Sequence, residues 1–417
     1  MFYKILYTVF LVVCFLYPFE YVVGPVALRH ILALMVLVWL IAHKQIKNDW
    51  VVYLFVIYLF FYLLSSVLTG FFTSFLPTLV GTFFLCLIMY WATMAMMKME
   101  GGGKWILYTL LSIATVDSVV TIAQYLNLSL AQQIANFLRV SLIDETTWEN
   151  YERYGGAVGG LVAGGLLRGV KNGYFLCSAV VFSLIGVKGG FKFKNALLCL
   201  FLSVALFVAQ ERAALYLGVL CLAIYFIISV SAGNRQRSAK LILYGIAILV
   251  IVAASGLFSY VNFGETRYAI LGGGADGRDV YWAKAFEFVR MHPLGGAYAF
   301  YADGGYPPHN FIPNSYVNGG LFGGTIVVAL VFAQIGICVK LLFEAFYKKN
   351  HTMPVVALAL IYLGYTGNSC FHNLALSMGD ETAFMWWAIL VSLLAQEKEA
   401  DRNPQESVQQ LNAPSET

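Results

Sequence analysis

The chain has 417 residues, of which 60% are hydrophobic and only 12% are charged. A soluble domain carries about 25% charged residues, so this chain has more apolar surface than a water-soluble fold can bury. The composition excludes a disordered chain, a secreted disulfide scaffold and an ordinary cytosolic enzyme. It indicates a polytopic membrane protein, because lipid solvates apolar helix faces. The net charge of +4 gives no sign of nucleic-acid binding.

The apolar runs predict an all-α integral membrane protein with about twelve transmembrane helices. A run of about 17–25 apolar residues is long enough to cross a bilayer as a helix. The expected spans lie near 5–21, 25–42, 50–69, 75–97, 105–126, 171–187, 195–210, 213–232, 241–260, 315–339, 353–371 and 381–395. The membrane domain therefore covers residues 1–395.

Basic residues in the short loops predict the orientation, because lysine and arginine are retained on the cytoplasmic side. With twelve crossings one side receives Lys4, Lys44, Lys47, Lys98, Lys104, Lys188, Lys192, Lys194, Arg235, Arg237, Lys240, Lys340, Lys348, Lys349, Lys398 and Arg402. We therefore expect both termini in the cytoplasm. The polar residues 396–417 predict a disordered cytoplasmic tail.

Two longer segments, 127–170 and 261–314, then face the periplasm. The second is the large loop between the ninth and tenth helices. The Gly-rich stretch 155–170 is expected to be re-entrant or to lie on the membrane surface, and close helix packing is the simpler alternative.

The outward basic residues are mostly arginines, whereas the cytoplasmic ones are mostly lysines. The outward set is Arg29, Arg139, Arg153, Arg168, Lys171, Arg212, Arg267, Arg278, Lys284 and Arg290. A planar guanidinium holds phosphate oxygens through two parallel hydrogen bonds. The bias therefore indicates a phosphate-bearing substrate on the outer side, with chance and ion pairs to acidic neighbours as the alternative.

Two of these arginines lie in distinctive surroundings. Arg212 stands between two apolar runs, where a charge is costly unless it is paired or used. The alternative is a structural role, in which the Arg212 side chain extends to the lipid headgroups. Arg278 follows a Gly-rich stretch and precedes Trp282 by four residues, a spacing that places both on one helical face. An amphipathic helix is expected over 283–291, ended by Pro293.

Histidines supply a candidate base. His309 lies between Pro308 and Asn310, directly before an apolar run. An imidazole titrates near neutral pH and can act as a general base, although a lone loop histidine is more often inert. His372, at the end of another run, either lines a cavity or caps a helix. The outward Trp and Tyr residues either stack against sugars or anchor the protein at the interface.

Short motifs in a fixed order resemble the O-antigen ligase/polymerase superfamily, which includes Wzy-type polymerases and WaaL-type ligases. They are QERAAL around Arg212, GRDVYW around Arg278, HPLGG from His292, PHN around His309 and then GGLFGG before a span. The resemblance covers residues 150–345, the ligase/polymerase-like core. Glu211 departs from the pattern, because many members carry Ser or Thr there, and its charge lies close to the expected anion site.

The resemblance implies a GT-C-like fold and a metal-independent, inverting glycosyltransferase that needs no cofactor. Its donor would be an oligosaccharide on undecaprenyl pyrophosphate, used at the periplasmic face of the bacterial inner membrane. Arg212 and Arg278 match the arginines that hold the pyrophosphate, and His309 matches the base. Supporting roles would fall to Arg290, Asn310, Trp282 and His372. Besides this donor, the expected partners are membrane lipid and a chain-length regulator protein.

We expect an O-antigen polymerase, which joins lipid-linked repeat units during lipopolysaccharide O-antigen biosynthesis. The close alternative is an O-antigen ligase, which transfers the glycan to lipid A–core with the same site chemistry. A secondary transporter is less favoured, because buried ionisable residues such as Asp117 and Glu20 are few and the two halves have unlike loops. A non-catalytic assembly protein is the last alternative.

Overall fold

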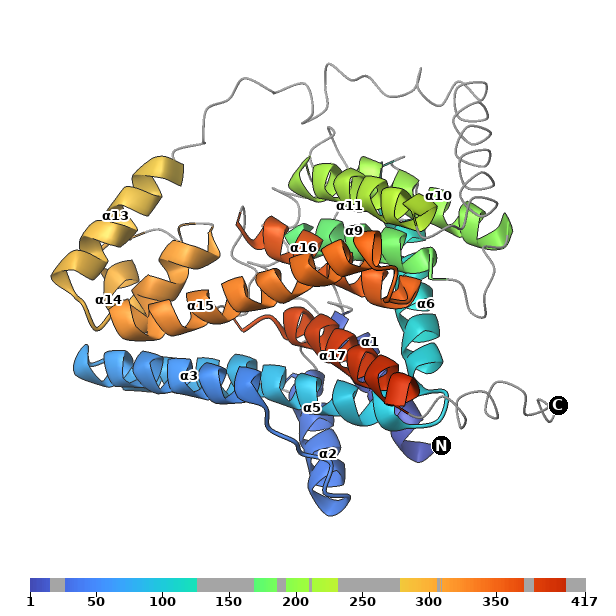
Figure 1. Cartoon of the computed structure of the whole chain (residues 1–417). Helices are drawn as coiled ribbons and strands as arrows, with labels where there is room; N and C mark the ends of the chain where they lie inside the picture. The colour runs from blue at the N-terminus through green and yellow to red at the C-terminus, as the bar shows by residue number, and fades with distance from the viewer. Residues whose placement is uncertain are drawn as a thin grey trace.

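The computed structural model describes residues 1–15, 27–125, 169–185, 193–209, 212–231, 278–305, 308, 310–370 and 379–402. Every regular element in these ranges is a helix, as the sequence predicts (Figure 1). The elements are α1 (Phe2–Phe15), α2 (Leu28–Ala42), α3 (Trp50–Leu68), α4 (Phe72–Thr78), η2 (Leu79–Phe83), α5 (Phe84–Lys98), α6 (Gly102–Tyr125), α9 (Gly169–Ser183), α10 (Phe193–Val208), α11 (Arg212–Ser231), α13 (Arg278–Met291), α14 (Ala297–Ala302), α15 (Phe311–Tyr347), α16 (Met353–Ser369) and α17 (Glu381–Arg402).

The helices are suited to a lipid environment. Large apolar side chains such as Leu34, Phe60, Val219 and Phe332 are exposed on the bundle surface, where lipid solvates them better than water. Within the described ranges, five helical segments are long and apolar enough to cross a membrane: Trp50–Leu68, Phe72–Lys98, Gly102–Ala123, Ala213–Ser231 and Phe311–Tyr347. The protein is therefore membrane-embedded.

Each predicted span overlaps a described helix except 241–260, which lies outside the described residues. The number of crossings and the GT-C-like fold stay predictions.

The bundle is organised around α16. This helix packs against α9, α11, α15 and α17, while α3 packs along α15 and α5 along α17. Figure 1 shows α13 and α14 beside the start of α15, at one edge of the bundle. The indole rings of Trp386 and Trp387 on α17 are buried in the core.

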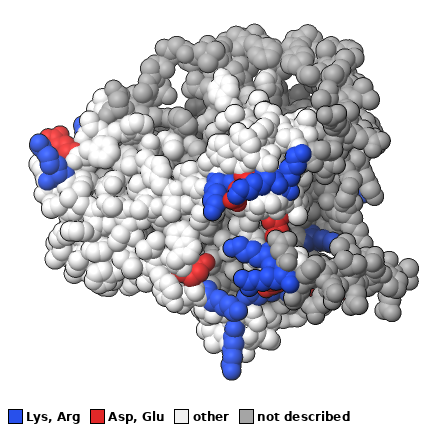
Figure 2. Space-filling view, viewed as in Figure 1, with Lys and Arg blue, Asp and Glu red and all other residues white. Residues whose placement is uncertain are grey.

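The first and last helices meet at the turn between α5 and α6. Lys4 Nζ donates to the Glu100 carbonyl over 2.6 Å, and Gln396 Nε2 donates to the Met97 carbonyl over 3.2 Å. We call this part of the bundle the lysine end, because it carries Lys4, Lys98, Lys104, Lys348, Lys349 and Lys398. In Figure 2 most of the visible Lys and Arg side chains gather here, apart from a group at the opposite edge.

The last helix is longer than the sequence predicts. The structure continues α17 to Arg402, so the start of the expected disordered tail, 396–402, is helical. The reason is an anchor at the lysine end: Glu397 accepts from the Thr352 backbone N–H over 2.7 Å and contacts His351 Nδ1 at 2.9 Å. Residues 403–417 lie outside the described part of the chain.

A kink interrupts α15 at Gly320, whose φ is 65° and ψ is −167°. In an uninterrupted helix the Leu321 N–H would donate to the Val317 carbonyl. Here Leu321 N donates to the Pro293 carbonyl over 2.8 Å, and the Val317 carbonyl accepts from Gly296 N over 2.9 Å. The turn after α13 thus satisfies both groups that the kink frees.

Glycine is required where these two segments touch. A Cβ atom on Gly320 would lie 2.5 Å from the Pro293 carbonyl oxygen and would overlap the Leu294 carbonyl carbon. A Cβ atom on Gly295 would lie 2.5 Å from the Gly320 nitrogen. The motifs HPLGG and GGLFGG, far apart in the chain, are therefore the two halves of one backbone contact.

Replacing Gly320 with Ala should destabilise the protein by about 2 kcal/mol or more, because alanine resists a positive φ and its methyl meets backbone. Thermal unfolding in detergent measures the effect. Gly336→Ala is the matched control, since it lies in the same helix and a Cβ there meets nothing within 4 Å. Equal unfolding temperatures for the two variants would contradict the role of the kink.

Candidate functional site

Helix α13 begins earlier than the sequence predicts. Its first residue is Arg278 rather than Ala283, and it ends at Met291, before Pro293, as expected. Arg278 and Trp282 are therefore one helical turn apart on the same face. The Arg278 side chain lies outside the described part of the structure, whereas that of Trp282 is half-buried.

Trp282 joins α13 to the segment that carries the candidate base. Its indole Nε1 donates to the Pro308 carbonyl over 2.6 Å. Pro308 directly precedes His309, and Asn310 on the other side is the N-cap of α15, accepting from Ile312 N over 2.9 Å. Both neighbours of His309 are thus held in place, one by α13 and one by α15. His309 itself lies outside the described residues.

Arg212 is the first residue of α11, and its side chain is not described. The contacts between α11 and α16 show where the start of α11 lies. A methyl group at Gly364 would lie 3.1 Å from Cys221 Sγ, and one at Gly367 would lie 3.2 Å from Leu217. The two helices are therefore antiparallel, and the start of α11 lies beside the end of α16. His372, beyond that end, lies outside the described residues.

Arg290 lies at the opposite end of α13 from Arg278. It lies in the last turn of the helix and is exposed. Twelve residues of helix place it about 18 Å along the axis from Arg278. The supporting role expected for Arg290 beside the pyrophosphate therefore does not follow from its position. The stretch 155–168 and most of the loop 127–170 lie outside the described residues.

Two of the outward aromatic residues pack within the protein. Tyr298 shares a hydrogen bond of 2.7 Å with Thr78 Oγ1 and stacks on Phe71. Burial, aided by the neighbouring Tyr298, raises the pKa of the Tyr301 hydroxyl to about 12. These two tyrosines fasten α14 to the bundle. Trp282, which is only half-buried, lies one helical turn from Arg278 and bonds to the segment that carries the candidate base.

Sequence reasoning missed a buried polar cluster formed by α9, α16 and the start of α17. Tyr174 donates to the Asn368 carbonyl over 2.7 Å, and its ring lies 5.5 Å from that of Tyr365. Tyr365 in turn donates to the Asp380 carboxylate. Glu381, also buried, follows Asp380 in the chain. We call these five residues the tyrosine–carboxylate cluster.

One member of this cluster has an unsatisfied side chain. Asn368 is fully buried, and neither its Oδ1 nor its Nδ2 has a hydrogen-bond partner among the described residues. Leaving such groups unpaired costs about 1–3 kcal/mol each. The amide and the two carboxylates of this cluster are donors and acceptors of the kind that sugar hydroxyls use. The pair Asp380–Glu381 next to an apolar run was the available sequence signal.

The described residues hold no group of three or more His, Cys, Asp or Glu side chains that could bind a metal ion. The sequence and the structure together offer guanidinium groups, an indole, an amide and carboxylates as candidate binding groups. Such groups bind an anion and sugar hydroxyls.

Comparisons with known proteins add no relative. No protein-family model matches the chain, and neither a curated protein nor a solved structure shows significant similarity to it. The interpretation of the site therefore depends on its residues and their geometry.

Replacing Trp282 with Phe should loosen the segment around Pro308, because it removes the indole N–H and leaves an aromatic ring. One hydrogen bond contributes about 1 kcal/mol, so amide hydrogen exchange at Asn310–Phe311 should quicken roughly fivefold. Phe286→Leu, an exposed change on the same helix, is the control. Unchanged exchange in Trp282→Phe would show that the bond does not hold this segment.

Proposed function

We propose that this protein is an O-antigen polymerase, a glycosyltransferase that joins undecaprenyl-pyrophosphate-linked repeat units at the periplasmic face of the inner membrane. The proposal rests on the sequence motifs and on one structural observation. The Trp282–Pro308 hydrogen bond connects the helix that starts at Arg278 to the segment that contains His309. The two residues that the chemistry needs thus belong to connected segments.

The chemistry follows from what each group offers. Lipid pyrophosphate leaves as an anion, so a cation near it stabilises the negative charge that develops in the transition state. Arg278 would hold the pyrophosphate with its bidentate fork, and His309 would take the proton from the attacking hydroxyl. Arg212, at the start of α11, would supply a second cation.

The tyrosine–carboxylate cluster supports a polar substrate at the same end of the bundle. The start of α11 lies beside the end of α16, where Asn368 has unpaired amide atoms. We propose that this amide binds hydroxyls of the acceptor sugar. Polar groups inside membrane helices are costly and are retained where they are used.

Purified protein incubated with lipid-linked repeat units tests the proposal. A ladder of products, each longer by one repeat, is the outcome expected of a polymerase, and His309→Ala should bind donor without forming the ladder. Transfer to added lipid A–core without a ladder would identify a ligase instead. Solute uptake by vesicles, with neither transfer reaction, would favour a transporter and overturn the enzyme proposal.

Arg278→Lys should lower the turnover of this reaction by about tenfold or more, because lysine keeps the charge but loses the bidentate fork. Initial rates of ladder formation measure the effect. Lys284→Arg, which changes an exposed cation on the same helix, should leave the rate unchanged. Wild-type turnover in Arg278→Lys would remove this residue from the pyrophosphate site.

A further inference from the structure

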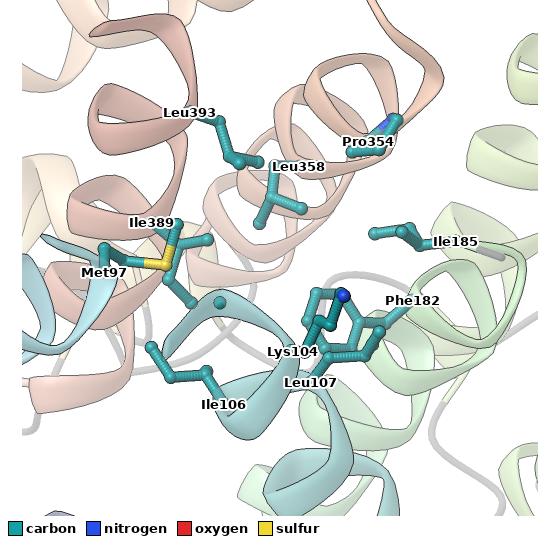
Figure 3. Close-up of a pocket in the computed structure, with 11 residues that line it drawn as sticks. Met97, Lys104, Ile106, Leu107, Phe182, Ile185, Pro354, Leu358, Ile389 and Leu393 are labelled. Atoms are coloured by element: carbon teal, nitrogen blue, oxygen red, sulfur yellow. The ribbon is translucent and has the colours of Figure 1, made fainter. Parts of the chain in front are cut away.

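A cavity of about 230 Å³ lies at the lysine end, away from α13 and the start of α15. It lies between the end of α5, the start of α6, the end of α9, the start of α16 and the later part of α17, and it is partly open to the surface of the bundle (Figure 3). The site proposed above uses none of these residues. The cavity therefore needs an explanation of its own.

The walls of the cavity are almost entirely apolar. They include Met97, Ile106, Leu107, Phe182, Leu358 and Leu393. An apolar cavity of about 150 Å³ already stays free of water and accepts a hydrocarbon guest. This larger cavity is thus suited to a hydrocarbon, and in a membrane the hydrocarbon at hand is a lipid acyl chain.

One charged group lines the cavity. Lys104, in the first turn of α6, is exposed, and Figure 3 shows its side chain among the lining residues, beside Leu107 and Phe182. No ion pair or hydrogen bond joins its ammonium group to another described residue. Its charge is therefore available to a ligand.

The surroundings of Lys104 favour an anion over a zwitterion. Lys4 and Lys98 lie at the same end, and Lys4 donates to the backbone of Glu100 rather than pairing with its carboxylate. Basic pockets between membrane helices on the cytoplasmic side bind anionic lipid headgroups.

We propose that this cavity binds an anionic membrane phospholipid, with an acyl chain between α5, α6, α9, α16 and α17 and the phosphate on Lys104. The bound acyl chain fills the space between these five helices. The lipid stabilises the folded state, since it binds only the native arrangement. The site is independent of the glycan chemistry at the other end.

Native mass spectrometry of the full chain released from nanodiscs tests the proposal. The bilayers contain dioleoyl phosphatidylglycerol and dioleoyl phosphatidylcholine in equal amounts. The wild type should retain one phosphatidylglycerol in preference to phosphatidylcholine. Lys104→Glu should weaken that retention by about tenfold or more, while Lys104→Arg should preserve it.

Two further variants separate the cavity from the general charge of the lysine end. Leu393→Trp fills the space from a half-buried position and should abolish retention with Lys104 intact. Lys349→Glu makes the same charge change at an exposed position outside the cavity and should retain lipid as the wild type does. Equal retention of the two lipids, or equal loss in Lys104→Glu and Lys349→Glu, would overturn the proposal.

Discussion

The exchange of backbone hydrogen bonds between the kink in α15 and the turn after α13 is the constraint on which the candidate site depends. A helix inside a membrane cannot leave an N–H or a carbonyl unpaired without a cost of several kcal/mol. The kink at Gly320 frees the Leu321 N–H and the Val317 carbonyl, and Pro293 and Gly296 supply their partners. The kink is therefore compatible with the membrane only while this turn is docked against it.

This constraint fixes the orientation of α13 relative to α15. The turn after α13 cannot shift along α15, because the two backbones are in direct contact at Gly295 and Gly320. At the other end of α13, the Trp282 indole bonds to the Pro308 carbonyl, and Asn310 then caps α15. The chain thus forms a closed loop, fastened at both ends of α13. Pro308 and Asn310, on either side of the candidate base in the sequence, are each held by a hydrogen bond of this kind.

The sequence predicts those features that depend on neighbouring residues. Apolar runs predict the helices, and Pro293 predicts the end of α13 because it lacks an N–H and restricts the residue before it. The start of α13 at Arg278 was not predicted, because the bond that holds its first turn comes from Pro308. The kink and the Tyr365–Asp380 contact likewise need partners from separate segments. The family resemblance placed Arg290 with Arg278 in one site, but the length of α13 separates the two residues.

The two ends of the bundle have opposite chemistry. At the lysine end the charged groups are exposed around an apolar cavity, as at a surface that meets lipid headgroups. Toward the other end the buried groups are polar: Asn310, Asn314, Asn318, Asn368, Asp380 and Glu381 are all buried. Each costs free energy in a membrane helix unless it has a partner or a use. Some of the cost is offset within the protein, as where Asn318 donates to the Tyr58 hydroxyl over 3.3 Å. The amide of Asn368 has no such partner in the described part of the chain, so its burial is a cost that the described contacts leave uncompensated.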